Sequence, residues 1–360
     1  MRLADLLVRY RQEFEEKYED TVLPEQRRAI DAIINCRTGL CGETMMFCVQ
    51  CDDLHTHEHS CGNRNCPQCQ NHTTTDWLER QKAKLLPVRY YLVTFTLPKE
   101  LRNTAYLNQR KVYDALFSAS IDTVNDVASN PRHLGARPGM TLVLHSHSRQ
   151  LNLHPHIHII LPAGGVMPKE QLWKQSSRKY MFPKDVLKIL FREKFLARLR
   201  NEKIPYPQQL HKMDWVVNIR AAGNGEPAMK YLSKYLYRGV IQERNIISDK
   251  NGMITFQYLN SKTRNTDQIT LPAADFIMRV IQHVLPKRFR RIRDTGFHHG
   301  NAKKTLWKIQ VRLAAAPMAV PKTEKPKLTC RFCGACLIIV PKNFNPHDNN
   351  LDRIRGSPKW

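Results

Sequence analysis

The chain has 360 residues, enough for two or three domains, because single hydrophobic cores rarely grow past a few hundred residues. Lys and Arg number 57 against 32 Asp and Glu, a formal net charge of +25, so we expect a polyanionic partner and nucleic acid first. A membrane partner is not expected, since no clear basic amphipathic helix or lipidation motif stands out. The N-terminus carries both signs of charge and is neither a signal peptide nor a spanning segment, which favours the cytoplasm.

Hydrophobic periodicity and turn residues predict helices mixed with antiparallel strand pairs. Apolar residues recur at helical spacing over residues 1–34, before the first cysteines. Further along the chain we expect, in order, a strand at 84–97, a helix at 104–128, strands at 140–148 and 151–165, a helix at 184–201, a strand at 215–222, a helix at 228–240, strands at 253–260 and 267–272, a helix at 273–286 and a linker at 314–327.

The ten cysteines indicate metal binding, because thiols of cytosolic proteins are kept reduced and seldom form disulfides. Seven lie within residues 36–69 and three within residues 330–336. Two CxxC knuckles in the first group have the spacing of one tetrahedral zinc site. The four zinc ligands that we predict are Cys48, Cys51, Cys66 and Cys69.

The remaining cysteines leave two alternatives open. In the first alternative, a second zinc ion takes its ligands from the group Cys36, Cys41, Cys61, His55, His57 and His59. In the second, the three histidines of this group are exposed polar residues of a loop. Near the C-terminus, a further metal-binding knuckle could be formed by Cys330, Cys333 and Cys336 with His347, and this is a weaker pattern than the two CxxC knuckles.

The segment HPHIH at residues 154–158 places three imidazoles on one face of a strand, because side chains alternate between faces. A proline inside a strand indicates that regular pairing begins after it, which favours His156 and His158 as a metal-binding pair. If the preceding strand pairs as a hairpin, His145 supplies a third ligand, with His147 as its competitor. A solvated histidine face is the alternative.

The segment KYLSKYLYR carries two tyrosines one helical turn apart, Tyr231 and Tyr235, which therefore share a helix face. Lys234 and Arg238 flank that face, whereas Tyr237 turns away from it. Tyrosines that simply pack against a sheet are the structural alternative.

Two histidines separated by one hydrophobic residue, followed by two tyrosines on a helix, resemble the HUH endonucleases. The chain is most similar to the rolling-circle, two-tyrosine transposases of bacterial insertion sequences. The resemblance rests on CRTG, SCGNRNCPQCQ, LNLHPHIHIIL, KYLSKYLYR and QHVLPKRFRRIRDTGF, in this order. It implies an α+β fold, with an antiparallel sheet, flanking helices and a small N-terminal zinc-binding domain. We expect a zinc-binding DNA-recognition domain at 1–83, a nuclease domain at 84–300 and a linker with a basic, cysteine-containing tail at 301–360.

The resemblance also implies a chemistry, in which a tyrosine attacks single-stranded DNA to give a 5′-phosphotyrosine and a free 3′-OH. Mg²⁺ or Mn²⁺ at the three histidines would polarise the phosphate, and Zn²⁺ would be structural. The implied nucleophiles are Tyr231 and Tyr235. The residues that we expect to contact DNA phosphates are Lys234, Arg238, Lys287, Arg288, Arg290, Arg291 and Arg293.

Three other functions compete with the transposase. A plasmid replication initiator or relaxase would share the chemistry, although the N-terminal zinc module favours a transposase. A zinc-dependent DNA-binding regulator would bind DNA without covalent capture. A zinc hydrolase would use the histidines but give the tyrosine helix no role.

Overall fold

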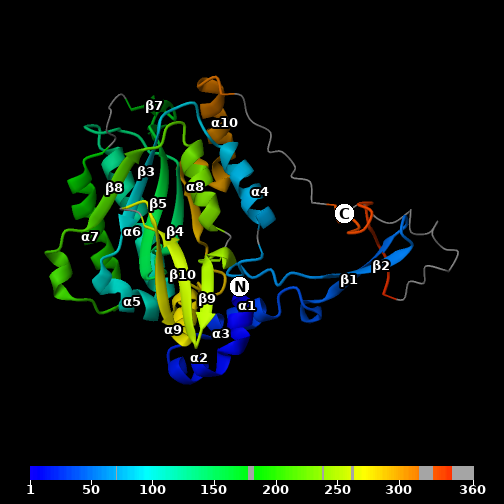
Figure 1. Ribbon diagram of the computed structural model, residues 1–360. Coiled ribbons are helices and arrows are strands. Elements are labelled where there is room, and N and C mark those ends of the chain that lie inside the picture. Colours follow the sequence, from blue (N-terminus) through cyan, green and yellow to red (C-terminus); the bar gives the residue numbers. More distant parts are fainter. Residues whose placement is uncertain (70, 177–181, 237–238, 261–262, 316–326, 343–360) are drawn as a thin grey trace.

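The computed structural model describes residues 1–69, 71–176, 182–236, 239–260, 263–315 and 327–342, apart from the side chains of residues 71–73 and 234–236 (Figure 1). The helices are α1 (Leu3–Arg9), α2 (Arg11–Tyr18), α3 (Pro24–Ile34), α4 (Asn71–Lys82), α5 (Arg102–Leu107), α6 (Gln109–Ser129), α7 (Lys184–Asn201), α8 (Glu226–Leu236), α9 (Ala273–Ile281) and α10 (Lys303–Arg312). The strands are β1 (Glu43–Cys48), β2 (Asp53–Glu58), β3 (Tyr90–Thr96), β4 (Met140–His147), β5 (Leu153–Pro162), β6 (Gly164–Val166), β7 (Trp173–Gln175), β8 (Val216–Ala221), β9 (Ile246–Lys250), β10 (Met253–Leu259), β11 (Thr266–Pro272), β12 (Ile292–Thr295) and β13 (Ile338–Ile339).

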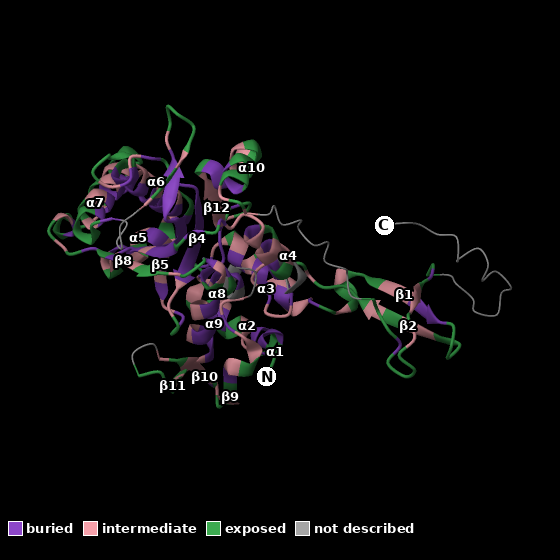
Figure 2. Ribbon diagram, turned by 90° about the horizontal axis from the view of Figure 1, so that it is seen from above, coloured by how far each residue is buried: buried purple, intermediate pink, exposed green. Residues whose placement is uncertain are grey.

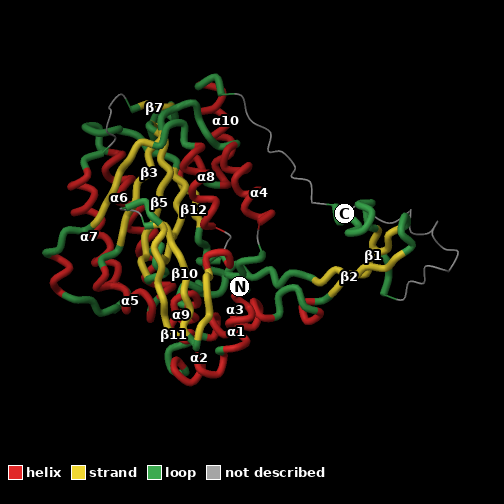
Figure 3. The backbone as a smooth tube through the Cα atoms, in the orientation of Figure 1, coloured by secondary structure: helices red, strands yellow, loops and turns green. Residues whose placement is uncertain are grey.

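A five-stranded antiparallel sheet in the order β12-β4-β5-β3-β8 forms the centre of the molecule (Figure 3). Helices α6 and α7 cover one face, and their apolar side chains bury the alternate residues of β3, β4 and β5. Phe95 of β3 packs against Phe191 of α7 with ring centroids 4.7 Å apart. The period-two alternation of these strands therefore assigns one face to this core.

The opposite face of the same sheet is half apolar and half polar. Leu92, Val143 and Ile160 pack there against Met229 and Leu232 of α8. Further along the same strands, the side chains on this face become threonine and histidine. Helix α8 thus lies across the boundary between a hydrophobic core and a polar site.

The first three helices share a second core with the three-stranded sheet β11-β10-β9 and helix α9. Phe14 of α2 is buried in the same cluster as Phe256 of β10 and Phe276 of α9. At its edge, the Tyr10 hydroxyl donates to Asp249 at 2.7 Å, and Lys17 Nζ lies 2.7 Å from Asp275. The N-terminal helices are therefore joined to segments more than two hundred residues away in the sequence.

A narrow arm built from β1, β2 and β13 projects from the body of the molecule (Figure 2). Its strands pair antiparallel, with Met46 opposite both His55 of β2 and Ile339 of β13. The C-terminal described residues are therefore part of a sheet that begins near the N-terminus.

The predicted α+β class, with an antiparallel sheet and flanking helices, is confirmed. The helix expected over residues 1–34 is three helices, and Pro24 at the first position of α3 starts a new one. The helix expected at 104–128 is divided at Asn108 into α5 and α6. Most of the expected linker, residues 316–326, lies outside the described residues. None of the helices that the structure describes combines the length and apolar character needed to cross a membrane.

Candidate metal and tyrosine site

Three histidines converge on the polar half of the sheet face below α8. His145 of β4 lies directly opposite His156 of β5, and His158 is two residues further along β5. One ring nitrogen from each lies within 4.8 Å of the others. The two strands pair as the sequence predicts, and this pairing brings together the three residues expected to bind a metal.

His147, the competitor for the third position, is placed elsewhere by a change of register. Pairing of β4 with β5 shifts between His145 and His147, so that His147 lies opposite Leu153. Pro155, which has no N–H to donate, lies on β5 within this irregular stretch. The ring of His147 lies instead against that of His283, with centroids 5.3 Å apart.

Hydrogen bonds orient two of the three imidazoles. Nδ1 of His156 donates to the carbonyl oxygen of His154 at 2.7 Å. Nδ1 of His158 lies 2.9 Å from Oγ1 of Thr94 on β3, and the tautomer that donates there keeps its lone pair on Nε2. Ligand histidines in metalloproteins commonly use their second nitrogen in this way.

Burial keeps the three imidazoles neutral. Desolvation lowers the pKa of His158 to about 3 and that of His156 to about 4, and it lowers the pKa of His145 well below its ordinary value. Neutral imidazole is the form that coordinates metal ions. Three neutral nitrogens clustered on rigid strands therefore fit a divalent cation.

Tyr231 on α8 faces this cluster. Its ring meets that of His158 edge to face, with centroids 6.1 Å apart and an interplanar angle of 89°. The guanidinium carbon of Arg220 on β8 lies 5.8 Å from the centroid of the same tyrosine ring. A phenol, a cation and the imidazoles are thus brought together on one face of the sheet.

Arg220 was not among the residues expected from the sequence. Apolar and polar residues alternate along β8, and this pattern indicates on which face of the sheet Arg220 lies. Val217 and Ile219 pack into the core on the other face. Asn218 pairs with Thr94 across the strands, and Arg220 therefore shares the histidine face. The sequence did not reveal that β8 lies beside β3.

Several predicted residues cannot be placed at the site. Tyr235 belongs to α8, but its side chain and that of Lys234 lie outside the described residues. Arg238, Tyr237 and His347 also lie outside them.

The four cysteines predicted to form one zinc site are divided between two clusters, so that grouping is wrong. Cys66 and Cys69 directly precede α4, whereas Cys48 ends β1 and Cys51 lies in the turn between β1 and β2, the strands that form the arm (Figure 1). The extended strands β1 and β2 separate the knuckle at residues 48–51 from the knuckle at residues 66–69 in space, although the two are close in sequence. The described clusters, each with its sulfur atoms within 4.8 Å of one another, are Cys36, Cys61, Cys66 and Cys69, and Cys48, Cys51, Cys330 and Cys333.

The first cluster has the geometry of a tetrahedral thiolate site. Sγ of Cys69 lies 3.5 Å from that of Cys36 and 3.7 Å from that of Cys61. A tetrahedron with Zn–S bonds of 2.3 Å requires sulfur atoms about 3.8 Å apart. A hydrogen bond with Cys66 lowers the pKa of Cys61 to about 5, which favours a thiolate there. Cys36 and Cys61, which had no role assigned from the sequence, complete this cluster.

The remaining candidates of the N-terminal region have other contacts. The Cys41 thiol donates to the Asn35 carbonyl at 3.0 Å, and His59 is hydrogen-bonded to Thr44 at 2.6 Å. His55 Nε2 lies 3.5 Å from the sulfur of Cys330. His55 and His57 lie on β2 rather than in the loop expected from the sequence. In the described part of the chain, none of His55, His57 and His59 joins a cluster of possible metal ligands.

The predicted basic segment is only partly exposed. Lys287, Arg288 and Arg290 are exposed. Arg291 is buried, with 9% of its surface accessible, and Arg293 forms an ion pair with Asp114. Arg291 is therefore not placed for the phosphate contact expected from sequence, and Arg293 already has an acidic partner.

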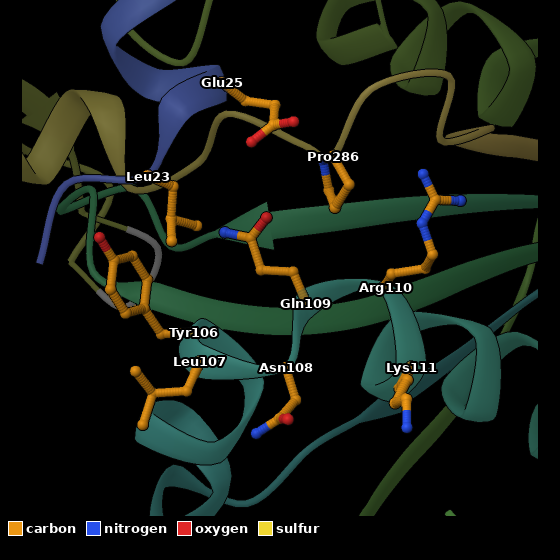
Figure 4. Close-up of a pocket in the computed structure, with 9 residues that line it drawn as sticks. All are labelled: Leu23, Glu25, Tyr106, Leu107, Asn108, Gln109, Arg110, Lys111 and Pro286. Atoms are coloured by element: carbon orange, nitrogen blue, oxygen red, sulfur yellow. The ribbon is translucent and has the colours of Figure 1, made fainter.

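The guanidinium of Arg293 also lies 4.0 Å from the ring centroid of Phe117. The exposed Arg288 and Arg290 line a groove with Arg110. This groove is the basic surface that the segment contributes. A smaller pocket lies between Leu23, Tyr106 and Pro286, and no histidine lines it (Figure 4).

The central antiparallel sheet with its flanking helices, together with clustered cysteines before it, defines an α+β protein with an N-terminal zinc-binding domain. Residues 139–305 match a family model described as "Putative transposase", and residues 6–97 match a transposase zinc-binding domain of IS91 type. The chain belongs to this family of insertion-sequence transposases.

Two curated relatives extend the similarity over most of the chain. "Putative transposase y4qJ" of Sinorhizobium fredii is 32% identical over 349 residues, covering 90% of this chain and 87% of that protein. The "Transposase for insertion sequence element IS801" of Pseudomonas savastanoi pv. phaseolicola is 28% identical over 344 residues, covering 86% and 82%. No solved structure matches the chain. The protein is therefore an enzyme that acts on DNA and contains a structural zinc-binding domain.

Proposed function

We propose that this transposase cuts and rejoins single-stranded DNA through a 5′-phosphotyrosine, in rolling-circle-type transposition. The observation that carries the proposal is the position of Tyr231, whose ring faces His158 of the histidine cluster. Tyr231 also packs against the core under α8, and packing alone does not require the three neutral imidazoles that converge beside its ring.

His145, His156 and His158 would hold Mg²⁺ or Mn²⁺, which when bound would withdraw charge from a phosphate oxygen. The phenolic oxygen of Tyr231 forms a bond to phosphorus, and the bond from phosphorus to the 3′-oxygen of the DNA breaks. The proton of the phenol is lost, and the leaving 3′-oxygen takes up a proton to become a 3′-OH. The number of phosphoester bonds is unchanged, so rejoining needs no ATP.

Arg220 supports this step electrostatically. A free tyrosine has a pKa of about 10, so its phenolate must be stabilised for attack at neutral pH. The guanidinium of Arg220 lies beside the ring of Tyr231 and is exposed to solvent. It is therefore accessible both to the developing phenolate and to a DNA phosphate.

Tyr235 follows Tyr231 by one turn of α8 and is proposed as the second nucleophile. One tyrosine would hold the first cut strand while the other attacks a second site. Lys234 and Arg238 would contact the DNA near them.

We assign DNA recognition to residues 1–83, strand transfer to residues 84–300 and a basic tail to residues 301–360, in a protein that acts in the cytoplasm. The exposed Arg288 and Arg290 extend the basic surface along the groove that they share with Arg110. A strand bound along this groove would be held by its phosphates rather than by its bases.

The experiment uses single-stranded oligonucleotides that span the ends of the element, labelled at either the 5′ or the 3′ end, with and without Mn²⁺. We expect the 3′ label to remain on denatured protein and the 5′ label to appear on a shorter free strand that ends in a 3′-OH. Binding without an adduct at any end would favour a non-catalytic zinc-dependent DNA-binding protein. Retention of the 5′ label instead would contradict the proposed polarity.

A further inference from the structure

We propose that Cys48, Cys51, Cys330 and Cys333 bind a second Zn²⁺ ion, which joins the C-terminal segment of the chain to the N-terminal arm. The two ligand pairs come from opposite ends of the sequence, so neither end contains the site alone. This inference does not depend on the proposed tyrosine chemistry.

The sulfur geometry fits a tetrahedral zinc ion. Sγ of Cys48 lies 3.5 Å from that of Cys333, and Sγ of Cys51 lies 3.9 Å from that of Cys330. These separations bracket the distance of about 3.8 Å that four Zn–S bonds of 2.3 Å require. Four thiolates select a soft ion such as Zn²⁺ over Mg²⁺ or Mn²⁺.

Both ligand pairs are CxxC knuckles, and the local backbone of the second has the tight turn that such a knuckle needs. The Phe332 amide donates to Sγ of Cys330 at 3.4 Å, and the Gly334 amide donates to the Cys330 carbonyl at 2.9 Å. Gly334 has a φ of +75°, a conformation that costs little only for glycine. Both cysteines of this pair are thereby turned toward the arm.

The strands on either side of the cluster are aligned with one another. Ile338 and Ile339 of β13 pair with Phe47 and Met46 of β1, and the Val340 amide donates to the Met45 carbonyl at 3.0 Å. Backbone pairing therefore places the two knuckles opposite each other, independently of the positions of the sulfur atoms.

The arm buries too little apolar surface to hold these strands together unaided. Its buried apolar side chains include Met46, Phe47 and Val340, and none of them belongs to the three hydrophobic cores of the described residues. Phe332 and Ile339 remain 66% and 67% exposed. Small modules of this kind are commonly held together by a structural metal.

Half of this site lies outside the zinc-binding domain that the family match defines. That match ends at residue 97, so it contains Cys48 and Cys51 but not their partners. The proposal thus assigns a role to Cys330 and Cys333, and it leaves Cys336 without one because its sulfur does not join the cluster.

The first measurement is the zinc content of the purified full chain, by inductively coupled plasma mass spectrometry. We expect two zinc ions per chain for the unmodified protein and one for the double variant Cys330→Ser/Cys333→Ser. The matched control Cys336→Ser, six residues from Cys330 and close to the same turn, should retain two. A His55→Ala variant should also retain two, since four thiolates complete the site. One ion in the unmodified protein, or two in the double variant, would overturn the proposal.

A second measurement needs no substitution of a ligand. A specific protease site inserted between residues 320 and 321 allows the full chain to be cut after folding. We expect the C-terminal fragment to remain bound to the rest in gel filtration, and to separate when a zinc chelator is added. Release before chelation, or retention after all zinc has been removed, would contradict a zinc-held junction.

Discussion

The rings of His158 and Tyr231 meet edge to face, with centroids 6.1 Å apart, where helix α8 crosses the central sheet. His158 is oriented from one side by Thr94, and Tyr231 is flanked on another by Arg220. The three histidines thus come from two strands and the tyrosine from one helix, whereas the supporting Thr94 and Arg220 come from two further strands, β3 and β8. This arrangement makes each supporting residue separately testable.

Substituting the two tyrosines should block different steps. We expect Tyr231→Phe to lower the rate of the first strand cleavage by at least about 10³-fold, because the ring remains but the nucleophilic oxygen is lost. Tyr235→Phe should permit a first cut and impair rejoining to a second site. Single-turnover assays with two labelled strands separate these steps. Full activity in both single variants would exclude a two-nucleophile mechanism.

Thr94→Val should weaken metal binding without removing a ligand. Loss of the hydroxyl that orients His158 should lower Mn²⁺ affinity about 10- to 100-fold, the usual effect of removing such a partner. Thr94→Ser, which keeps the hydroxyl, is the matched control and should bind nearly as well as the unmodified protein. Electron paramagnetic resonance titration of free Mn²⁺ gives both affinities. Equal affinity in the valine variant would show that Thr94 does not position the imidazole.

Arg220→Ala should slow cleavage up to about 100-fold, toward the lower end of the range for loss of one charge-stabilising group. Arg220→Lys keeps the charge but not the planar guanidinium, and it should recover part of the rate. Single-turnover cleavage at saturating DNA separates this effect from binding. If alanine changes only the affinity for DNA, Arg220 contacts the strand without assisting the chemistry.

Gly239→Ala should destabilise the contact between the first cysteine cluster and the segment that follows α8. A Cβ atom there would lie 2.6 Å from the Asn65 carbonyl oxygen and 3.3 Å from the Pro67 nitrogen, both backbone atoms. We expect a loss of about 1–3 kcal/mol in unfolding free energy, as for overpacked sites. The control Gly300→Ala meets nothing within 4 Å and should be neutral. Equal denaturation midpoints would show that the knuckle and this segment are not in contact.

His283 should make the folded protein less stable in acid. Burial lowers its pKa to about 4, its Nε2 donates to the Leu151 carbonyl at 2.9 Å, and nearby Arg291 disfavours the cation further. The unfolded chain takes up this proton near pH 6.5 and the folded chain only near pH 4, so stability falls as pH decreases between these values. The expected slope is up to about 1.4 kcal/mol per pH unit.

The variant His283→Gln isolates this contribution, because its amide can still donate to Leu151 but does not titrate. Urea unfolding at a series of pH values should show a shallower decline for the variant between pH 6.5 and 4. Identical slopes would mean that other groups account for the acid sensitivity.

The sequence predicted the local features of the site well. Alternation of HPHIH and the one-turn spacing of the tyrosines depend only on strand and helix geometry, which neighbours along the chain determine. The α+β class followed from the same patterns together with the family resemblance. His145 could be favoured over His147 because a hairpin constrains which residues lie opposite each other.

Long-range pairing was the part that the sequence could not provide. Nothing local to Cys48 indicates that its neighbour is Cys333 rather than Cys66, since both partners lie in CxxC knuckles. Arg220 reaches the site only because β8 lies beside β3, and Arg291 is buried only because of the elements that cover it. Such contacts depend on topology, which composition and periodicity leave undetermined.

The most direct test of the tyrosine mechanism is to identify the residue that carries DNA. The adduct formed with Mn²⁺ on a single-stranded element end is digested with nuclease and protease, and the nucleotide-linked peptide is sequenced by mass spectrometry. The account predicts a nucleotide joined through its 5′-phosphate to Tyr231, or to Tyr235 when both cuts proceed. A nucleotide on any other residue, or on a 3′-phosphate, would contradict it.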